Sequence, residues 1–144
     1  MKTIRFTEDI YTYHIDFAGH VSNIVYIQWM EIGRLKLLEE AGMPAHEIME
    51  KSRILPSLAA TSIQYKKQLF LGETVHIELW LSQLRNVSAV MEFRFYNNGQ
   101  ELTASGQQKA LFLNMEDRRP HRLAPEERQR FEPFLKADIG PESS

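Results

Sequence analysis

Hydrophobic and polar residues follow two different periods along the chain. Residues 22–41 carry apolar side chains around most of a helical wheel, and Gly42 and Pro44 follow where such a helix would end. A helix this broadly apolar is expected to be surrounded by protein. Residues 74–81 and 89–96 instead alternate with a period of two, which predicts strands that bury one face.

Weaker patterns predict the remaining elements. Residues 3–10 indicate a short first strand, and the ranges 57–65 and 101–113 indicate two more. Gly106 lies inside the last of these strands, which suggests a bulge or a close approach by another part of the protein. Residues 125–136 begin with proline and are typical of a short C-terminal helix.

These elements predict an α+β protein in which residues 1–136 form a single domain. A curved, five-stranded antiparallel sheet wrapped around the long helix would bury the apolar residues of both. Residues 137–144 read as a flexible tail. An open sheet has edge strands that need a partner, so a homodimer or homotetramer is expected.

Composition narrows the class of protein. The 144 residues include 17 basic and 19 acidic side chains, which gives no general attraction to nucleic acid or to an anionic membrane. Because cysteine is absent, disulfides and a thiol nucleophile are excluded. We find no signal peptide and no apolar run long enough for a membrane span, so a cytoplasmic protein is expected.

Several common catalytic patterns are missing. The chain has no serine elbow, no phosphate-binding loop and no dinucleotide-binding fingerprint. His14, Asp16 and His20 lie near one another but fit no established metal-ligand spacing, so no metal site is predicted. The sequence therefore leaves catalysis by side chains and backbone groups, without a cofactor, as the expected kind of chemistry.

The segment from Asp16 to Asn23 offers such chemistry. The first N–H groups of a helix have no partner within the helix, and a helix that starts near Ser22 or Asn23 would direct them at a carbonyl or an oxyanion. A turn at Ala18 and Gly19 would fold Asp16 back to the other side of that carbonyl. The simpler interpretation is an acidic residue in an ordinary turn before a helix.

Residues 16–34 also read D-x-x-G-H-V-x-N-x-x-Y-x-x-W-x-E-x-G-R. This pattern resembles the signature of hotdog-fold acyl-CoA thioesterases of the 4-hydroxybenzoyl-CoA thioesterase-like family. The resemblance continues through residues 65–81 and 104–127, so it covers nearly the whole chain. It implies the hotdog fold and the hydrolysis of acyl thioesters carried by coenzyme A or by acyl carrier protein.

Carried over by position, the resemblance implies a catalytic role for Asp16, as nucleophile or general base. It also implies that the backbone N–H of Asn23 polarises the thioester carbonyl, that Gly19 permits the turn, and that His20 is a further candidate. The family often has Asp-Thr-Asp where this chain has His14-Ile15-Asp16, which argues against a mechanism with two carboxylates.

Coenzyme A would enter only as part of the substrate, and its phosphates need cationic or polar contacts. Fold analogy makes Lys66, Arg85 and Ser88 candidates for them. Glu31 falls among apolar positions of the predicted helix, and a structural ion pair with Arg34 is favoured over catalysis.

Two other functions remain open. Hotdog hydratases and dehydratases combine an aspartate with a histidine five residues on, whereas Asp16 and His20 are four apart and the usual Asn-Pro is missing. A protein with the same fold could also bind acyl groups without hydrolysing them. Loss of the double bond of an enoyl-CoA, or binding without thiol release, would identify these alternatives.

Overall fold

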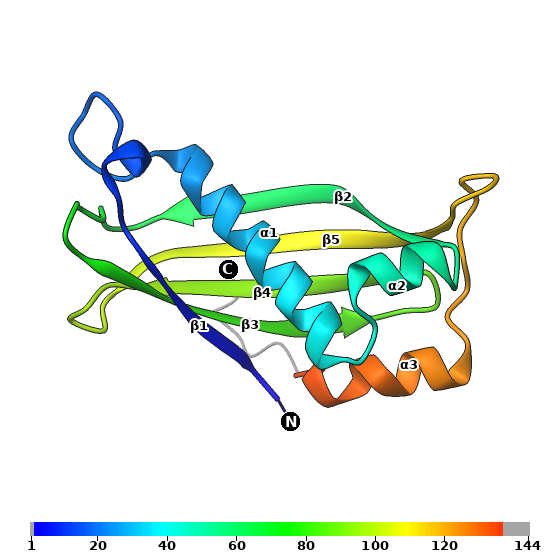
Figure 1. Cartoon of the computed structure of the whole chain (residues 1–144). Coiled ribbons are helices and arrows are strands. Elements are labelled where there is room, and N and C mark those ends of the chain that lie inside the picture. The colour runs from blue at the N-terminus through cyan, green and yellow to red at the C-terminus, as the bar shows by residue number, and fades with distance from the viewer. Residues whose placement is uncertain (1, 137–144) are drawn as a thin grey trace.

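A five-stranded antiparallel sheet curves around one long helix in the computed structural model, which describes residues 2–136 (Figure 1). The strand order is β1-β3-β4-β5-β2. In chain order the elements are β1 (Ile4–Asp9), η1 (Thr12–His14), α1 (Asn23–Glu40), α2 (Ala45–Glu50), β2 (Ile54–Tyr65), β3 (Thr74–Leu84), β4 (Ser88–Tyr96), β5 (Leu102–Asn114), α3 (Pro125–Phe131) and η2 (Glu132–Phe134). The predicted tail at 137–144 lies outside the described residues.

Helix α1 begins and ends where local signals predict. Ser22 caps its start, with the Ser22 Oγ accepting from the Ile24 N–H at 3.4 Å. Gly42 follows its end with φ of +76°, a left-handed conformation that glycine adopts without steric cost. The predicted helix at 22–41 is therefore confirmed to within one residue at each end.

Helix α1 lies close against the sheet at Gly106. A Cβ atom built on Gly106 would lie 2.8 Å from the Met30 Cε, so a side chain at this position would require the end of Met30 to move. Of the two alternatives predicted for Gly106, the close approach is the one present. The bulge in this pair of strands is elsewhere, between Leu58 and Ala60 of β2.

The expectation that protein surrounds α1 is wrong for this chain. Ile24, Ile27 and Leu35 keep 66%, 46% and 44% of their surface exposed. Within one chain, other residues cover only the side of α1 that is opposite these exposed side chains. Glu31 lies on the same exposed side and forms the predicted ion pair with Arg34.

Strand β2 is an edge strand and begins three residues before the predicted range of 57–65. Pro56 is tolerated near its start because an edge strand leaves one row of N–H groups unpaired. Towards its end, nearly all of residues 58–65 are exposed.

At the C-terminus, α3 ends at Phe131 and the short 3-10 turn η2 continues to Phe134, so the predicted helix at 125–136 is too long. No helix within residues 2–136 combines the length and apolarity needed to cross a bilayer.

Candidate active site

The loop before α1 is a tight, hydrogen-bonded turn. Ile15 and Val21 face each other in an isolated antiparallel bridge. Inside this bridge, the Asp16 N–H donates to the His20 carbonyl and the Gly19 N–H donates to the Asp16 carbonyl, each at 3.0 Å. Gly19 has φ of +87°, where other residues are strained. The turn predicted between Asp16 and the helix is therefore present.

The Asp16 side chain is half-buried and held in one orientation. Its Oδ1 accepts a hydrogen bond from the Ala18 N–H at 2.9 Å, a local turn that aspartate commonly forms. No donor within residues 2–136 is bonded to the second carboxylate oxygen. One oxygen thus fixes the side chain and the other remains available to react.

The start of α1 presents a free backbone donor. The Ser22 N–H donates to the His14 carbonyl at 2.9 Å, and the Val25 N–H donates to the Ser22 carbonyl at 3.0 Å. The Ile24 N–H is used by the Ser22 cap. Among the described residues, no acceptor takes the N–H of Asn23, and Asn23 is exposed. This N–H can donate to the oxygen of a bound carbonyl group.

The two histidines of this region have different environments. His14 is buried, its Nδ1 accepts from the Tyr11 N–H at 2.9 Å, and its ring meets Trp29 edge-on. His14 therefore supports the fold of the loop. His20 is half-buried, and its Nδ1 lies 3.2 Å from the Val21 carbonyl oxygen, so the hydrogen bond requires the proton on Nδ1.

A pocket of about 220 Å³ opens at the helix start. Its lining combines His20 and Asn23 with Tyr65 and Lys66, which come from the end of β2 and the turn after it. Asp16 is not part of this lining. The structure thus brings His20, Asn23 and Lys66 together around one space, with Asp16 in the adjoining turn.

Two tyrosines flank this pocket. The Tyr65 hydroxyl donates to the Asn23 carbonyl at 3.3 Å, and the Tyr26 hydroxyl donates to the Thr103 Oγ1 at 3.5 Å. Burial raises the pKa of both phenols because it disfavours the charged phenolate. Both side chains therefore act as neutral donors over the physiological pH range.

The two lysines after β2 differ in their partners. The Lys67 Nζ donates to Glu101 Oε2 at 2.6 Å, and this hydrogen bond is the main reason why the pKa of the Glu101 carboxyl is lowered. Lys66 forms no ion pair with any residue in 2–136 and remains available to an anionic ligand.

Arg85 and Ser88 lie at the opposite end of the sheet, in and beside the hairpin between β3 and β4 (Figure 1). The Arg85 N–H donates to the Ser88 carbonyl at 2.8 Å, and Ser88 is only 5% exposed. Arg128 of α3 donates to the Arg85 carbonyl at 3.4 Å. The structure therefore does not bring Arg85 and Ser88 to the helix start where Lys66 lies.

Sequence reasoning did not assign a role to Tyr65. A signal was present, because Tyr65 ends the predicted strand at 57–65 and directly precedes two lysines, Lys66 and Lys67. Residues 2–136 contain no group of three acidic or histidine side chains arranged to hold a metal ion.

The strand order and the single long helix define the hotdog class of fold. Among solved structures, the DHNA-CoA thioesterase from Staphylococcus aureus superposes with a TM-score of 0.84 at 21% identity, over 92% of this chain and 91% of that one. The structure of BH1999 gentisyl-coenzyme A thioesterase gives a TM-score of 0.76 at 25% identity, over 90% and 99% of the two chains.

Sequence comparison gives the family. Residues 10–137 match the Thioesterase-like superfamily. A relative from Bacillus subtilis (strain 168), named "Putative acyl-CoA thioesterase YneP", is 30% identical over 105 residues, which are 73% of this chain and 75% of the relative. A 1,4-dihydroxy-2-naphthoyl-CoA hydrolase from Prochlorococcus marinus (strain NATL1A) is 27% identical over 70% of this chain and 68% of its own. The chain therefore belongs to the Thioesterase-like superfamily, and its class of reaction is thioester hydrolysis.

Proposed function

We propose that the protein hydrolyses acyl-CoA thioesters to a free acid and coenzyme A at the start of α1. The observation that carries this proposal is the exposed Asn23 N–H, which has no acceptor within the described residues. A thioester oxygen bound there would gain a donor just as negative charge develops on it. The acyl-CoA substrates named for the relatives support the choice of coenzyme A, and acyl carrier protein is the alternative carrier.

Asp16 supplies the second component of the mechanism. As a nucleophile, its free oxygen attacks the thioester carbon, the thiolate leaves, and water then hydrolyses the mixed anhydride. As a general base, Asp16 takes a proton from a water molecule that attacks the same carbon. In both routes one water is consumed, and an acid and a thiol are produced. Gly19 sets the turn that holds Asp16, and His20, which lines the pocket, is proposed to contact the leaving thiol.

Lys66 is proposed to bind a phosphate of coenzyme A, since it lines the pocket and has no ion pair with a described residue. Arg85 and Ser88, at the other end of the sheet, stay proposed as contacts for a phosphate of coenzyme A. Coenzyme A belongs to the substrate, and the reaction as written needs no further cofactor.

We also propose that the protein is a cytoplasmic homodimer or homotetramer that binds neither nucleic acid nor membranes. Strand β2 supports the assembly, because it is an edge strand with nearly all of residues 58–65 exposed. Pairing of two such edges would satisfy the unpaired backbone groups of both copies. The molecular mass in solution tests this assembly.

Thiol release from a panel of short, long and aromatic acyl-CoAs tests the activity. We expect release of coenzyme A together with the free acid from at least one member of the panel. An enoyl-CoA added to the same panel separates hydrolysis from hydration, since hydration removes the conjugated double bond and releases no thiol. Binding of the panel without thiol release would replace the proposal with a non-catalytic acyl-binding protein.

A further inference from the structure

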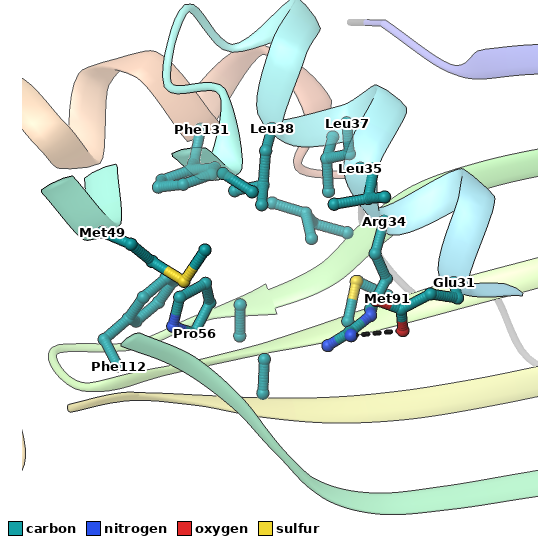
Figure 2. Close-up of a pocket in the computed structure, with 14 residues that line it drawn as sticks. Glu31, Arg34, Leu35, Leu37, Leu38, Met49, Pro56, Met91, Phe112 and Phe131 are labelled. Atoms are coloured by element: carbon teal, nitrogen blue, oxygen red, sulfur yellow. Dashed lines mark hydrogen bonds and ion pairs between the residues drawn. The ribbon is translucent and has the colours of Figure 1, made fainter. Parts of the chain in front are cut away.

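A second cavity of about 160 Å³ lies under the C-terminal half of α1, between that helix and the sheet (Figure 2). Most of its walls are aliphatic, aromatic or thioether groups, among them Leu38, Met49, Pro56, Ala110, Phe112 and Phe131. The charged residues in the lining are Glu31 and Arg34, which are paired with each other. None of the residues around the helix start lines this cavity.

The volume limits what the cavity can hold. A dry protein cavity of about 150 Å³ lined by apolar side chains binds benzene. A cavity of about 160 Å³ therefore accepts about six carbon atoms. Away from Glu31 and Arg34, the apolar walls favour a hydrocarbon over a polar group, because they offer a buried polar group no partner.

The cavity lies well away from the proposed reaction centre. Glu31, at the near side of the cavity, is eight residues beyond Asn23, or about 12 Å along a helix that rises 1.5 Å per residue. An extended chain with C–C bonds of about 1.5 Å needs about ten carbons to cover this distance. A ring system attached directly to the thioester would end before the cavity.

Two exposed apolar side chains of α1 lie between the helix start and the cavity. At about 100° per residue, Ile24 and Ile27 fall on the same side of the helix as Glu31 and Leu35, which line the cavity. Ile24 and Ile27 are also the exposed hydrophobic residues between the helix start and the cavity on that side. A hydrocarbon chain lying over them would cover apolar surface that is otherwise in water.

We propose that the acyl group of the substrate is a linear aliphatic chain of about sixteen carbons whose terminal carbons occupy this cavity. About ten carbons cross the exposed side of α1 and about six enter the cavity. This inference rests on the proposed thioesterase reaction for the position of the carbonyl. It assigns the choice of substrate to Ala89 and Ala110, two small residues of the cavity wall.

Ala89→Leu tests the proposal, because it fills the cavity with three further carbon atoms. Its control is Val90→Leu, which places the same side chain at the next position of β4, on the opposite face of the sheet. Two quantities are measured for wild type and both variants: kcat/KM for saturated acyl-CoAs of increasing length, and the Tm shift produced by hexadecanoate. Ala110→Leu provides a second filled cavity if Ala89→Leu does not fold.

For the wild type, kcat/KM is expected to be highest near sixteen carbons. Ala89→Leu is expected to lower kcat/KM for that substrate at least tenfold and to change the value for ten-carbon substrates less than twofold, with Val90→Leu like wild type. Highest activity on short or ring-containing substrates, with no effect of a filled cavity, would overturn the inference and leave the thioesterase proposal intact. Binding of hexadecanoate by wild type but not by Ala89→Leu, without any hydrolysis, would support the cavity assignment and reject the thioesterase proposal. If the wild-type protein shows no hydrolysis and no binding of hexadecanoate, the inference is overturned.

Discussion

The Tyr65 hydroxyl donates a hydrogen bond to the backbone carbonyl of Asn23 at 3.3 Å, so the last residue of β2 holds the first residue of α1. The Tyr65 ring also meets Tyr26 edge-on, with 5.2 Å between the ring centres. The N–H of the same Asn23 is the proposed donor to the thioester. Tyr65 is therefore a positioning residue for that donor.

Tyr65→Phe keeps the aromatic ring and removes this hydrogen bond. Because such a bond contributes about 1 kcal/mol, we expect kcat to fall about fivefold if the bond holds Asn23 for the transition state. The measurement is kcat alongside the Tm. Tyr96→Phe, on the opposite face of the sheet, is the control and should retain activity. An unchanged kcat in Tyr65→Phe would show that the bond has no role in positioning.

Gly19→Ala should damage the turn that carries Asp16. The left-handed backbone at Gly19 costs about 1–2 kcal/mol for a residue with a side chain. Gly42→Ala is a matched control, since Gly42 also has positive φ but lies at the other end of α1. Both variants should lower the free energy of unfolding, and only Gly19→Ala should also lower kcat in the folded enzyme. Equal kcat values for the two variants would contradict a special role for this turn.

Lys66→Gln should weaken substrate binding through coenzyme A. Loss of a charged hydrogen bond to phosphate costs about 1.5–3 kcal/mol, so we expect KM to rise about 10–150-fold with little change in kcat. Thioesters of N-acetylcysteamine lack these phosphates and should be hydrolysed equally by wild type and variant. A rise in KM for both kinds of thioester would assign Lys66 to another part of the site.

Tyr26 should contribute to loss of stability at alkaline pH. Burial raises the pKa of its phenol above the ordinary value of 10.0, so the folded state holds this proton more strongly than the unfolded state. The resulting stabilisation is complete below pH 10 and is lost as the pH rises through the folded-state pKa. Denaturant unfolding from pH 8 upwards should show a smaller alkaline decline in Tyr26→Phe than in wild type. Identical declines would contradict this assignment.

Local signals in the sequence predicted the elements well. Ser22 and Gly42 bracket α1 because capping depends on residues within one turn of the helix end. The start of β2 was missed because Pro56 argues against a strand unless the strand lies at an edge. Edge position is a property of the whole sheet and has no local signature.

The site could be predicted only in part. The turn at Gly19 follows from neighbouring residues, and the structure contains it. Arg85 lies far from Lys66 because eleven residues of β3 run between the two ends of the sheet, and spacing in the sequence does not give that separation. The exposure of Ile24 was likewise hidden, because a helical wheel identifies apolar positions without identifying what covers them.

The proposed mechanism requires the Asp16 carboxylate for thioester hydrolysis. Asp16→Asn tests it most directly, since an asparagine oxygen can still accept from the Ala18 N–H and preserve the turn. Asp117→Asn is the matched control, because Asp117 accepts from the Arg119 N–H at the same 2.9 Å and the same spacing.

The measurement is kcat for thiol release by the three purified, folded proteins on one acyl-CoA. We expect Asp16→Asn to lower kcat by about 10²-fold or more and Asp117→Asn to match wild type. Full activity of Asp16→Asn would contradict the mechanism, whatever substrate the protein prefers.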